Sequence, residues 1–266
     1  MRRLAPAAVF HDSGRAGASV NALLAVESIG KSFGMRNVLT TASMWAQPER
    51  VTVLLGRNGC GKTTLVKIAV GLIRADYGVV IYRGVRTLRP RLHELARSGL
   101  YYLPERNLLS PAFTLGEHFG AVERLVPDAK TEAALELLRL HEFIDRKPGA
   151  LSGGERRRAE IAIAVARRPM CLLADEPYMG IMPNDVELIS RAFRELADHG
   201  CALVVTGHEV RTLLDVADDV IWQTAGTTHH IGTPDQAQRN HQFRREYLGP
   251  GFALPDESGK GVGPPQ

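Results

Sequence analysis

An eight-residue glycine-rich stretch, GRNGCGKT at residues 56–63, constrains most strongly how this chain can fold. It matches the pattern G-x-x-x-x-G-K-[ST] and lies between the β-branched run VTVLL (51–55) and the amphipathic stretch GKTTLVKIAVGLI. Such a loop wraps backbone N–H groups around phosphate oxygens, and the N-terminus of the following helix adds partial positive charge. The sequence therefore predicts a nucleotide phosphate site, with Lys62 at the β- and γ-phosphates and Thr63 on Mg²⁺. The predicted nucleotide-binding residues of the loop are Gly56, Asn58, Gly59, Cys60, Gly61, Lys62, Thr63 and Thr64.

Two adjacent acids, Asp175 and Glu176, end a second apolar run, CLLAD at 171–175. Carboxylates beside apolar residues are costly unless a positive partner lies close to them. In phosphate-loop proteins a second strand ends in an acid that holds Mg²⁺, so Asp175 is predicted to have that role. Glu176 is predicted to face the γ-phosphate as the general base that takes a proton from the attacking water. The alternative interpretation is a pair of solvated acids that cap a turn.

Short apolar runs alternate with helical patterns in the second half of the chain. CLLAD and CALVVTG (201–207) flank a stretch with helical spacing at 184–200, with Asn184 as the expected N-cap and Gly200 just past the helix end. Strand, helix and strand in this order predict parallel strands joined by a crossover helix. Residues 113–168 are instead helical and charged, with no convincing strand. We therefore expect an α/β fold with a mostly parallel sheet and a helical insertion.

The composition sets limits on partners and location. The 266 residues are 44% hydrophobic and carry a net charge of +4, too weakly basic to argue for nucleic acid. No apolar run approaches the roughly 18 residues of a membrane-spanning helix, and the short, proline-interrupted N-terminal patch is a poor signal peptide. Three cysteines without close pairing fit a reducing compartment, with Cys171 and Cys201 expected in the core. Residues 1–20 and 249–266 are predicted to be disordered tails around one folded domain, 21–248.

A third motif, LSGGE at 151–155, lies between the phosphate loop and LLADEP. In this order and at these distances the three motifs resemble those of the ATP-binding-cassette (ABC) ATPases, over residues 22 to about 248. The resemblance implies a phosphate-loop NTPase core, an N-terminal antiparallel β part and a helical subdomain, about 106–168, that carries LSGGE. It also implies a head-to-tail dimer, in which LSGGE opens a helix toward the γ-phosphate of the ATP bound by the other subunit. The residues offered to that phosphate are Ser152, Gly153 and Gly154.

The resemblance assigns further positions one at a time. Phe33, in KSFG, corresponds to the aromatic residue that stacks on adenine; the alternative is an ordinary core aromatic. His208, in VVTGH, corresponds to the switch histidine that contacts the γ-phosphate. Glu105, in YYLPERN, stands where most members have a glutamine that completes the Mg²⁺ and water shell, so it keeps an oxygen ligand and adds a negative charge. The predicted catalytic residues are thus Glu176, His208 and Lys62, and the predicted metal ligands are Thr63, Asp175 and Glu105.

Met182 is a second departure from the family pattern. The family usually reads Glu-Pro-x-x-Gly-Leu-Asp-Pro, whereas EPYMGIMP here replaces the aspartate with Met182. That aspartate normally crosses the dimer interface, so its loss puts tight coupling between the two sites in doubt and leaves the hydrolysis residues in place. A non-identical ATPase partner that supplies the aspartate is one explanation. The Pro-Glu pair at Glu105 and EYLG at 246–249 resemble the branched-chain amino acid import and lipopolysaccharide-export branches.

The resemblance implies an ATP-binding and ATP-hydrolysing subunit that powers an ABC transporter through a separate integral membrane subunit, docked near Glu105 and residues 106–125. Its cofactors would be ATP and Mg²⁺, and a second ABC ATPase subunit, identical or not, would be its other partner; no nucleic acid is expected. It would lie in the cytoplasm, peripheral on the inner face of the cell membrane. The alternative is a soluble ABC ATPase that acts on ribosomes or DNA, although such proteins carry two cassettes or a long coiled coil. A catalytically dead regulatory cassette is disfavoured by the intact Lys62, Asp175 and Glu176. The transported substrate and its direction are left open.

Overall fold

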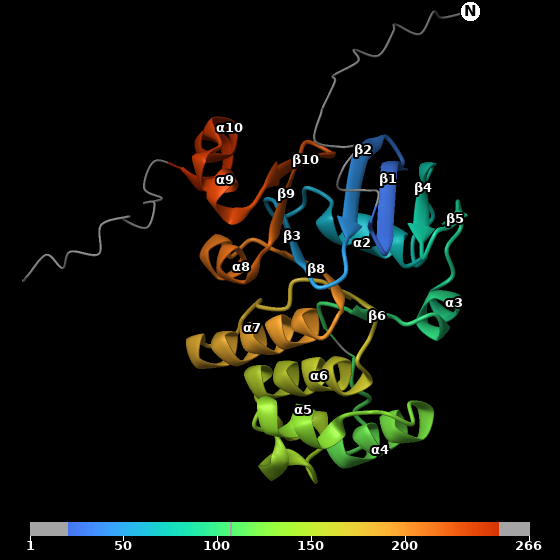
Figure 1. Cartoon of the computed structure of the whole chain (residues 1–266), viewed down its shortest axis with the longest axis vertical. Helices are drawn as coiled ribbons and strands as arrows, with labels where there is room; N and C mark the ends of the chain where they lie inside the picture. The colour runs from blue at the N-terminus through green and yellow to red at the C-terminus, as the bar shows by residue number, and fades with distance from the viewer. Residues whose placement is uncertain (1–20, 107, 250–266) are drawn as a thin grey trace, which may run out of the picture.

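The computed structural model describes residues 21–106 and 108–249. Its ten strands form one sheet in the order β5-β4-β1-β2-β10-β9-β3-β8-β7-β6 (Figure 1). The predicted tails lie outside the described residues, apart from Gly249. No helix within the described ranges is long and apolar enough to cross a membrane.

One end of the sheet is antiparallel. It consists of β1 (Leu24–Phe33), β2 (Arg36–Ala46), β4 (Tyr77–Tyr82) and β5 (Val85–Thr87), paired in antiparallel register. Arg83 and Gly84 join β4 to β5 with positive φ angles of 52° and 78°, as a two-residue hairpin turn of type I′ requires. The implied N-terminal antiparallel part is therefore confirmed, and β5 is its edge strand.

The other end of the sheet is mostly parallel, as predicted. Its parallel strands are β6 (Leu100–Leu103), β7 (Cys171–Ala174), β8 (Ala202–Gly207), β3 (Val51–Leu55) and β9 (Asp219–Thr224), while β10 (Thr227–Gly232) returns antiparallel to β9. All residues of β3, β7 and β8 are buried, which explains their unbroken apolar or β-branched sequences. Cys171 and Cys201 are core thiols, also as predicted.

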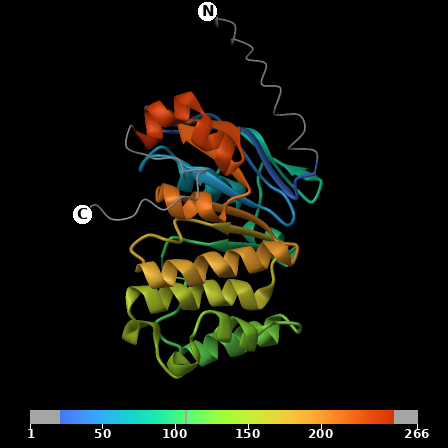
Figure 2. The ribbon, with the colours of Figure 1, turned by 60° about the vertical axis from the view of Figure 1, so that its left-hand side comes forward.

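Helices cover the sheet and build the insertion. Those near the sheet are α2 (Lys62–Ala69), α3 (Leu92–Arg97), α7 (Pro183–Asp198), α8 (Val210–Val216), α9 (Pro234–Arg239), α10 (His241–Phe243) and a closing π-helical turn (Arg244–Leu248). The insertion contains α4 (Leu115–Leu125), α5 (Thr131–Leu137), α6 (Gly153–Arg167) and two short 3-10 turns (His141–Phe143 and Pro148–Ala150). In Figures 1 and 2 these helices stack below α7, away from the sheet.

The start of α7 differs from the sequence prediction. Met182 is the N-cap and Pro183 the first helical residue, so the prediction of Asn184 as the cap is wrong. Proline is favoured in the first helical turn because its fixed φ suits the helix and its missing N–H has no partner to lose there. The predicted stop is confirmed, because α7 ends at Asp198 and Gly200 follows with φ 95°.

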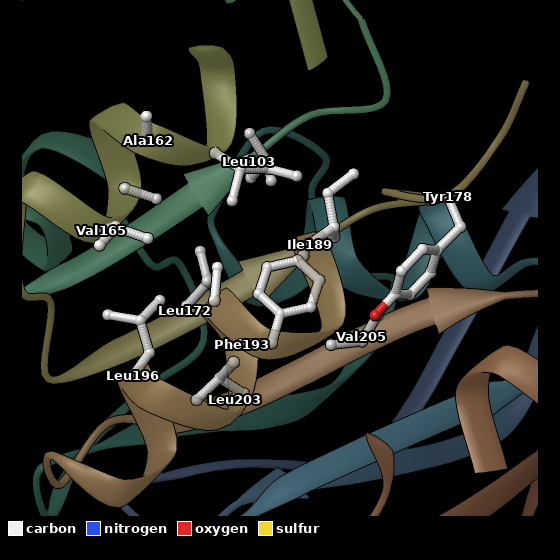
Figure 3. Close-up of a cluster of buried hydrophobic side chains, with 14 of the residues drawn as sticks. Leu103, Ala162, Val165, Leu172, Tyr178, Ile189, Phe193, Leu196, Leu203 and Val205 are labelled. Atoms are coloured by element: carbon white, nitrogen blue, oxygen red, sulfur yellow. The ribbon is translucent and has the colours of Figure 1, made fainter. Parts of the chain in front are cut away.

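A buried apolar cluster binds the insertion to the sheet. It lies where α6 and α7 meet β6, β7 and β8, and Phe193 of α7 lies at its centre (Figure 3). Tyr178, just after the paired acids, packs edge-on against Phe193 at a ring distance of 6.0 Å, and its hydroxyl lies 3.0 Å from Ser190 Oγ. The loop that carries the acids is thereby held against the core.

Candidate functional site

The phosphate loop joins β3 to α2 with a backbone that requires glycine. Gly59 and Gly61 have φ angles of 78° and 105°, in the region that L-residues rarely adopt. A side chain at Gly61 would also come within 2.8 Å of Leu39 and 2.9 Å of the Gln223 side chain. The Gln223 amide donates to the Cys60 carbonyl oxygen at 2.9 Å, which fixes the loop from its outer side.

Lys62, the first residue of α2, is buried and held by its own loop. Its side chain is 4% exposed, and Nζ donates to the Gly56 carbonyl oxygen at 2.8 Å. The same Nζ lies 3.1 Å from Glu176 Oε1. The positive partner that the two adjacent acids require is therefore Lys62, which reaches Glu176 directly.

The Asp175 carboxylate accepts hydrogen bonds from threonine hydroxyls on two other elements. Thr63 Oγ1 of α2 and Thr206 Oγ1 of β8 donate to Asp175 Oδ1 at 3.0 and 2.8 Å. Burial raises the pKa of the Asp175 carboxyl, while these two hydrogen bonds oppose the rise. A buried carboxylate beside a threonine hydroxyl offers the hard oxygen donors that Mg²⁺ prefers, and a bound cation would offset the cost of burying the charge. These residues therefore fit a magnesium ion.

Glu176 is held in an unusual backbone conformation, with its side chain between those of Lys62 and His208. Its φ angle is 45°, which is uncommon for a residue other than glycine and typical of functional sites. The conformation is stabilised because its N–H donates to Thr206 Oγ1 at 2.9 Å. His208 Nδ1 lies 3.0 Å from Glu176 Oε2, and His208 Nε2 lies 3.5 Å from Glu209 Oε1. Both carboxylate oxygens of Glu176 thus have a partner on another element.

A cavity of about 500 Å³ opens above these groups. Phe33 is 49% exposed at its edge, with Lys31 Nζ 5.2 Å from the ring centre. Glu105 also borders it, with Oε1 3.2 Å from Arg106 Nε. The structure thus brings most of the predicted site residues to one cavity: Phe33, Asn58, Gly59, Gly61, Lys62, Thr63, Thr64, Glu105, Glu176 and His208.

Two predicted residues of the phosphate loop, Gly56 and Cys60, do not line this cavity. Gly56 contributes its carbonyl oxygen to Lys62 and does not line the cavity. Cys60 lines a separate hollow of about 510 Å³ on the other side of the loop, next to the C-terminal turn. Its sulfur lies close to Gly56, so that a Cβ added there would come within 2.6 Å of Sγ.

The signature residues do not join this cavity within the chain. Ser152 and Gly153 are exposed at the start of α6. Gly153 lines a further hollow, which shares Glu105 and Met179 with the cavity that holds Lys62. Ser152 Oγ accepts from the Glu155 N–H at 3.2 Å, and the Ser152 N–H in turn donates to Glu155 Oε2 at 2.7 Å. This capping box leaves the Ser152 hydroxyl proton free to donate outward.

The structure adds residues that the sequence analysis did not single out. Arg157, buried on α6, donates to the backbone oxygens of Pro104, Asp175 and Pro177 and pairs with Glu160 at 2.8 Å. Thr206 bridges the two acids, as described above. Thr206 could have been found from its place at the end of a strand beside CLLAD, whereas nothing in the run of arginines at 156–158 distinguishes Arg157 from its neighbours.

A second link joins the signature helix to the start of α7. Arg158 Nε lies 2.9 Å from Asp185 Oδ1, and both side chains are largely buried. The other carboxylate oxygen of Asp185 lies against Gly154, where an added Cβ would come within 2.2 Å of it. The loop that contains Met182 is therefore tied to the signature glycines inside one chain.

Comparison with known proteins agrees with this arrangement. Residues 39–179 match the ABC transporter family model. The chain is 36% identical over 239 residues to the lipopolysaccharide export system ATP-binding protein LptB of Haemophilus influenzae, covering 87% of this chain and 99% of that protein. It is 32% identical to LptB of Escherichia coli K12, covering 88% of this chain and all of that protein.

The fold is likewise similar to solved ATP-binding cassettes. The ADP conformation of MJ1267, an ATP-binding cassette of an ABC transporter, superposes with a TM-score of 0.75 at 24% identity, covering 86% of this chain and 99% of that chain. A nucleotide-free cassette from an ABC transporter gives a TM-score of 0.74 at 23% identity, covering 85% and 98%. The chain therefore belongs to the ABC transporter family, in which it is an ATP-binding subunit that hydrolyses ATP to power transport.

Proposed function

We propose that this chain is the ATPase of a transporter of the lipopolysaccharide-export type, working from the cytoplasmic face of the membrane on separate membrane subunits. The observation that carries the proposal is the end-to-end similarity to lipopolysaccharide export ATP-binding proteins, which covers 99% of the Haemophilus protein. The match covers 87% of this chain, so it necessarily includes the phosphate loop at 56–63. The substrate would accordingly be an amphipathic lipid moved outward.

The proposed reaction begins with ATP in the cavity beneath Phe33. Lys62 would exchange its contacts with the Gly56 carbonyl oxygen and Glu176 Oε1 for the β- and γ-phosphate oxygens, which would lie at the N-terminus of α2. That exchange releases Glu176 Oε1, which then accepts a proton from the water that attacks the γ-phosphorus. His208, 3.0 Å from Glu176 in this structure, would orient that carboxylate and contact the γ-phosphate. The terminal phosphorus–oxygen bond breaks, and ADP leaves with phosphate.

Mg²⁺ would be held by Thr63 and Asp175, with Glu105 at the edge of its shell. The ion would neutralise charge on the β- and γ-phosphates. The hydrogen bond from Thr206 already orients the Asp175 carboxylate for this role, because it fixes Oδ1 beside Thr63. Glu105 would be more loosely placed, since its side chain is 39% exposed and paired with Arg106.

A second subunit would complete each site. Ser152 and Gly153 face outward and lie outside the cavity that holds Lys62, so they are suited to the γ-phosphate bound by a partner. The N-terminus of the 15-residue helix α6 would supply partial positive charge to that phosphate. We infer a head-to-tail dimer with an identical or related ATPase subunit.

The membrane subunit would dock beside Glu105. The adjoining segment exposes Phe113, whose side chain is 52% accessible and packs edge-on against His118. Large exposed aromatic side chains of this kind are typical anchors of protein interfaces. Movement of a docked segment would reach the nucleotide through Glu105, which borders both the nucleotide cavity and the hollow beside Gly153.

Purification of the chain from its native membranes, followed by identification of the co-purifying subunits, tests the partner class. The proposal predicts integral membrane transporter subunits, and co-purification with ribosomes or DNA would contradict it. The reconstituted complex then tests the substrate, because lipopolysaccharide should stimulate ATP hydrolysis and leucine should not. Stimulation by leucine alone would instead assign the complex to amino acid import.

A further inference from the structure

The positive charge of this chain is concentrated in one short segment. Residues 71–100 contain six arginines and two acids, so their formal charge of +4 equals that of the whole chain. The remaining sequence therefore has no net charge, and the positive charge of residues 71–100 calls for a local explanation. The six arginines are Arg74, Arg83, Arg86, Arg89, Arg91 and Arg97, all exposed.

These arginines gather at one corner of the molecule. The edge strand β5 lies above helix α3 on the right-hand side of Figure 1. Arg83 of the β4–β5 turn donates to the Ser98 carbonyl oxygen, one residue after Arg97. Arg74 and Arg89 line the same shallow hollow of about 140 Å³. Contacts thus connect the turn, the edge strand and the helix into one surface, here called the arginine corner.

Most of this charge is not neutralised within the chain. Arg86 lies 3.7 Å from Glu27 and Arg91 lies 3.1 Å from Glu94, and both pairs are solvent-exposed. Exposed pairs of this kind contribute little and are screened by salt. Within residues 21–106 and 108–249, Arg74, Arg89 and Arg97 have no ion pair.

Aliphatic side chains are interleaved with the arginines. Val85 is 69% exposed between Arg83 and Arg86, and Leu88 is 71% exposed beside Arg89. Arginine on an edge strand can simply block pairing with another sheet, which would account for Arg86. That explanation does not cover the arginines of the α3 segment, and it gives no reason for large apolar side chains to face water.

We propose that the arginine corner lies on the anionic phospholipid surface of the membrane, beside the docked membrane subunit. Guanidinium groups interact with lipid phosphates, while side chains such as Val85 and Leu88 enter the boundary between headgroups and acyl chains. Nucleic acid is a poorer match, because single strands are bound through aromatic stacking, whereas Val85 and Leu88, the exposed apolar side chains beside Arg83, Arg86 and Arg89, are aliphatic.

The position of the corner in the chain supports the same partner. Helix α3 continues through β6 directly into Glu105, where the membrane subunit is proposed to dock. A surface that joins the docking segment within a few residues would face the same bilayer. This inference rests on the proposed transporter function, because only a membrane-bound complex brings the corner to lipid.

Flotation of the purified full-length chain with lipid vesicles tests the proposal. Vesicles of phosphatidylcholine with phosphatidylglycerol should bind the chain, pure phosphatidylcholine should not, and 0.5 M NaCl should release it, since charge drives the contact. Arg89→Gln with Arg97→Gln should weaken binding roughly 25-fold, at about fivefold for each arginine near an anionic surface. The matched control is Arg139→Gln with Arg191→Gln, which removes the same charge from exposed positions elsewhere.

The outcomes separate this inference from the proposed function. ATP hydrolysis by both double variants should equal that of the parent chain, because none of the four arginines lines the nucleotide cavity. Binding that is independent of phosphatidylglycerol, or lost equally in the control, would overturn the inference. Binding of polyuridylate RNA that needs Arg89 and Arg97, with no vesicle binding, would also overturn it. In either case co-purification with membrane subunits would still support the transporter function.

Discussion

The nucleotide half and the signature half of the site differ in how their polar groups are satisfied. Lys62, Asp175 and Glu176 are at most 9% exposed, and each is bonded to a neighbour in the same chain. Ser152 and Gly153, in contrast, face solvent, and Met182 is 70% exposed. The first half is complete in one chain, and the second presents unused donors to another molecule. Under the proposed function, the contrast implies that the binding and catalytic groups are preorganised and that pairing with a second subunit controls when they act.

The substitution Glu176→Gln tests the nucleotide half and should have the largest effect. Loss of a general base lowers turnover by about 10² to 10⁴-fold, while the neutral amide still fits beside Lys62 and His208. ATP binding should persist and an ATP-bound dimer should accumulate, measured by phosphate release and sedimentation. Glu209→Gln is the control, because Glu209 contacts His208 but not Lys62. Ordinary turnover in Glu176→Gln would remove the general-base assignment.

Arg157 joins the two halves, because it lies on the signature helix and binds the backbone of the acidic loop. Replacing it with methionine leaves Glu160, 3% exposed, without its cation, which should cost about 3–5 kcal/mol of unfolding free energy. Urea unfolding measures the loss. Arg156→Met, at a less buried position, should cost under about 1 kcal/mol. Equal losses in the two variants would mean that Arg157 does not connect the halves.

Cys60 probes the outer side of the phosphate loop. Burial raises the pKa of this thiol, although Lys62 opposes the rise. Its thiolate fraction is therefore smaller than usual at pH 7, and alkylation should accelerate about tenfold per pH unit up to pH 9. Mass spectrometry of iodoacetamide-treated protein measures the rate, with Cys60→Ser as control. Cys171 and Cys201, both buried, should stay unlabelled until the chain unfolds. Labelling of Cys60 that levels off below pH 8 would contradict the raised pKa.

Cys60 labelling also tests whether the loop surrounds nucleotide. Alkylation should inhibit ATP hydrolysis, because the added group would push against Gly56 and Lys62 at the inner side of the loop. ATP should protect the thiol by ordering the loop. Full labelling without any loss of activity would place Cys60 outside the working part of the site.

Met182 is the departure of the signature half from the usual family pattern, and replacing it with aspartate should have the smallest effect. The residue is the N-cap of α7 but makes no side-chain cap bond. Aspartate there could accept an N–H of the first turn, which is worth about 1 kcal/mol and raises the melting temperature by about 2–4 °C. It should also strengthen cooperativity of ATP hydrolysis in the dimer. Met182→Asn is a control that caps the helix without adding charge. If neither the melting temperature nor the cooperativity changes, the methionine at position 182 is neutral.

The sequence predicted those parts of the site whose residues are adjacent along the chain. GRNGCGKT, the two acids and LSGGE each lie within a few consecutive positions, so their spacing alone indicates phosphate chemistry. Thr206 and Arg157 act on acids 18 to 31 residues away, and those contacts exist only after the sheet and α6 are packed. The side of the loop on which Cys60 lies, and the start of α7 at Pro183, likewise follow from local backbone geometry that the pattern does not specify.

Mixing two inactive variants tests most directly whether each site needs two chains. Lys62→Ala disables the nucleotide half, and Gly153→Asp places a negative charge where the partner's γ-phosphate would bind. The structure leaves open space at Gly153, so the aspartate fits without a clash. Each variant alone should be inactive, and an equimolar mixture should recover up to about a quarter of the parent ATPase activity, because half of the dimers then contain one intact composite site. Full activity of Gly153→Asp alone, or no recovery in a mixture shown to form mixed dimers, would contradict the account.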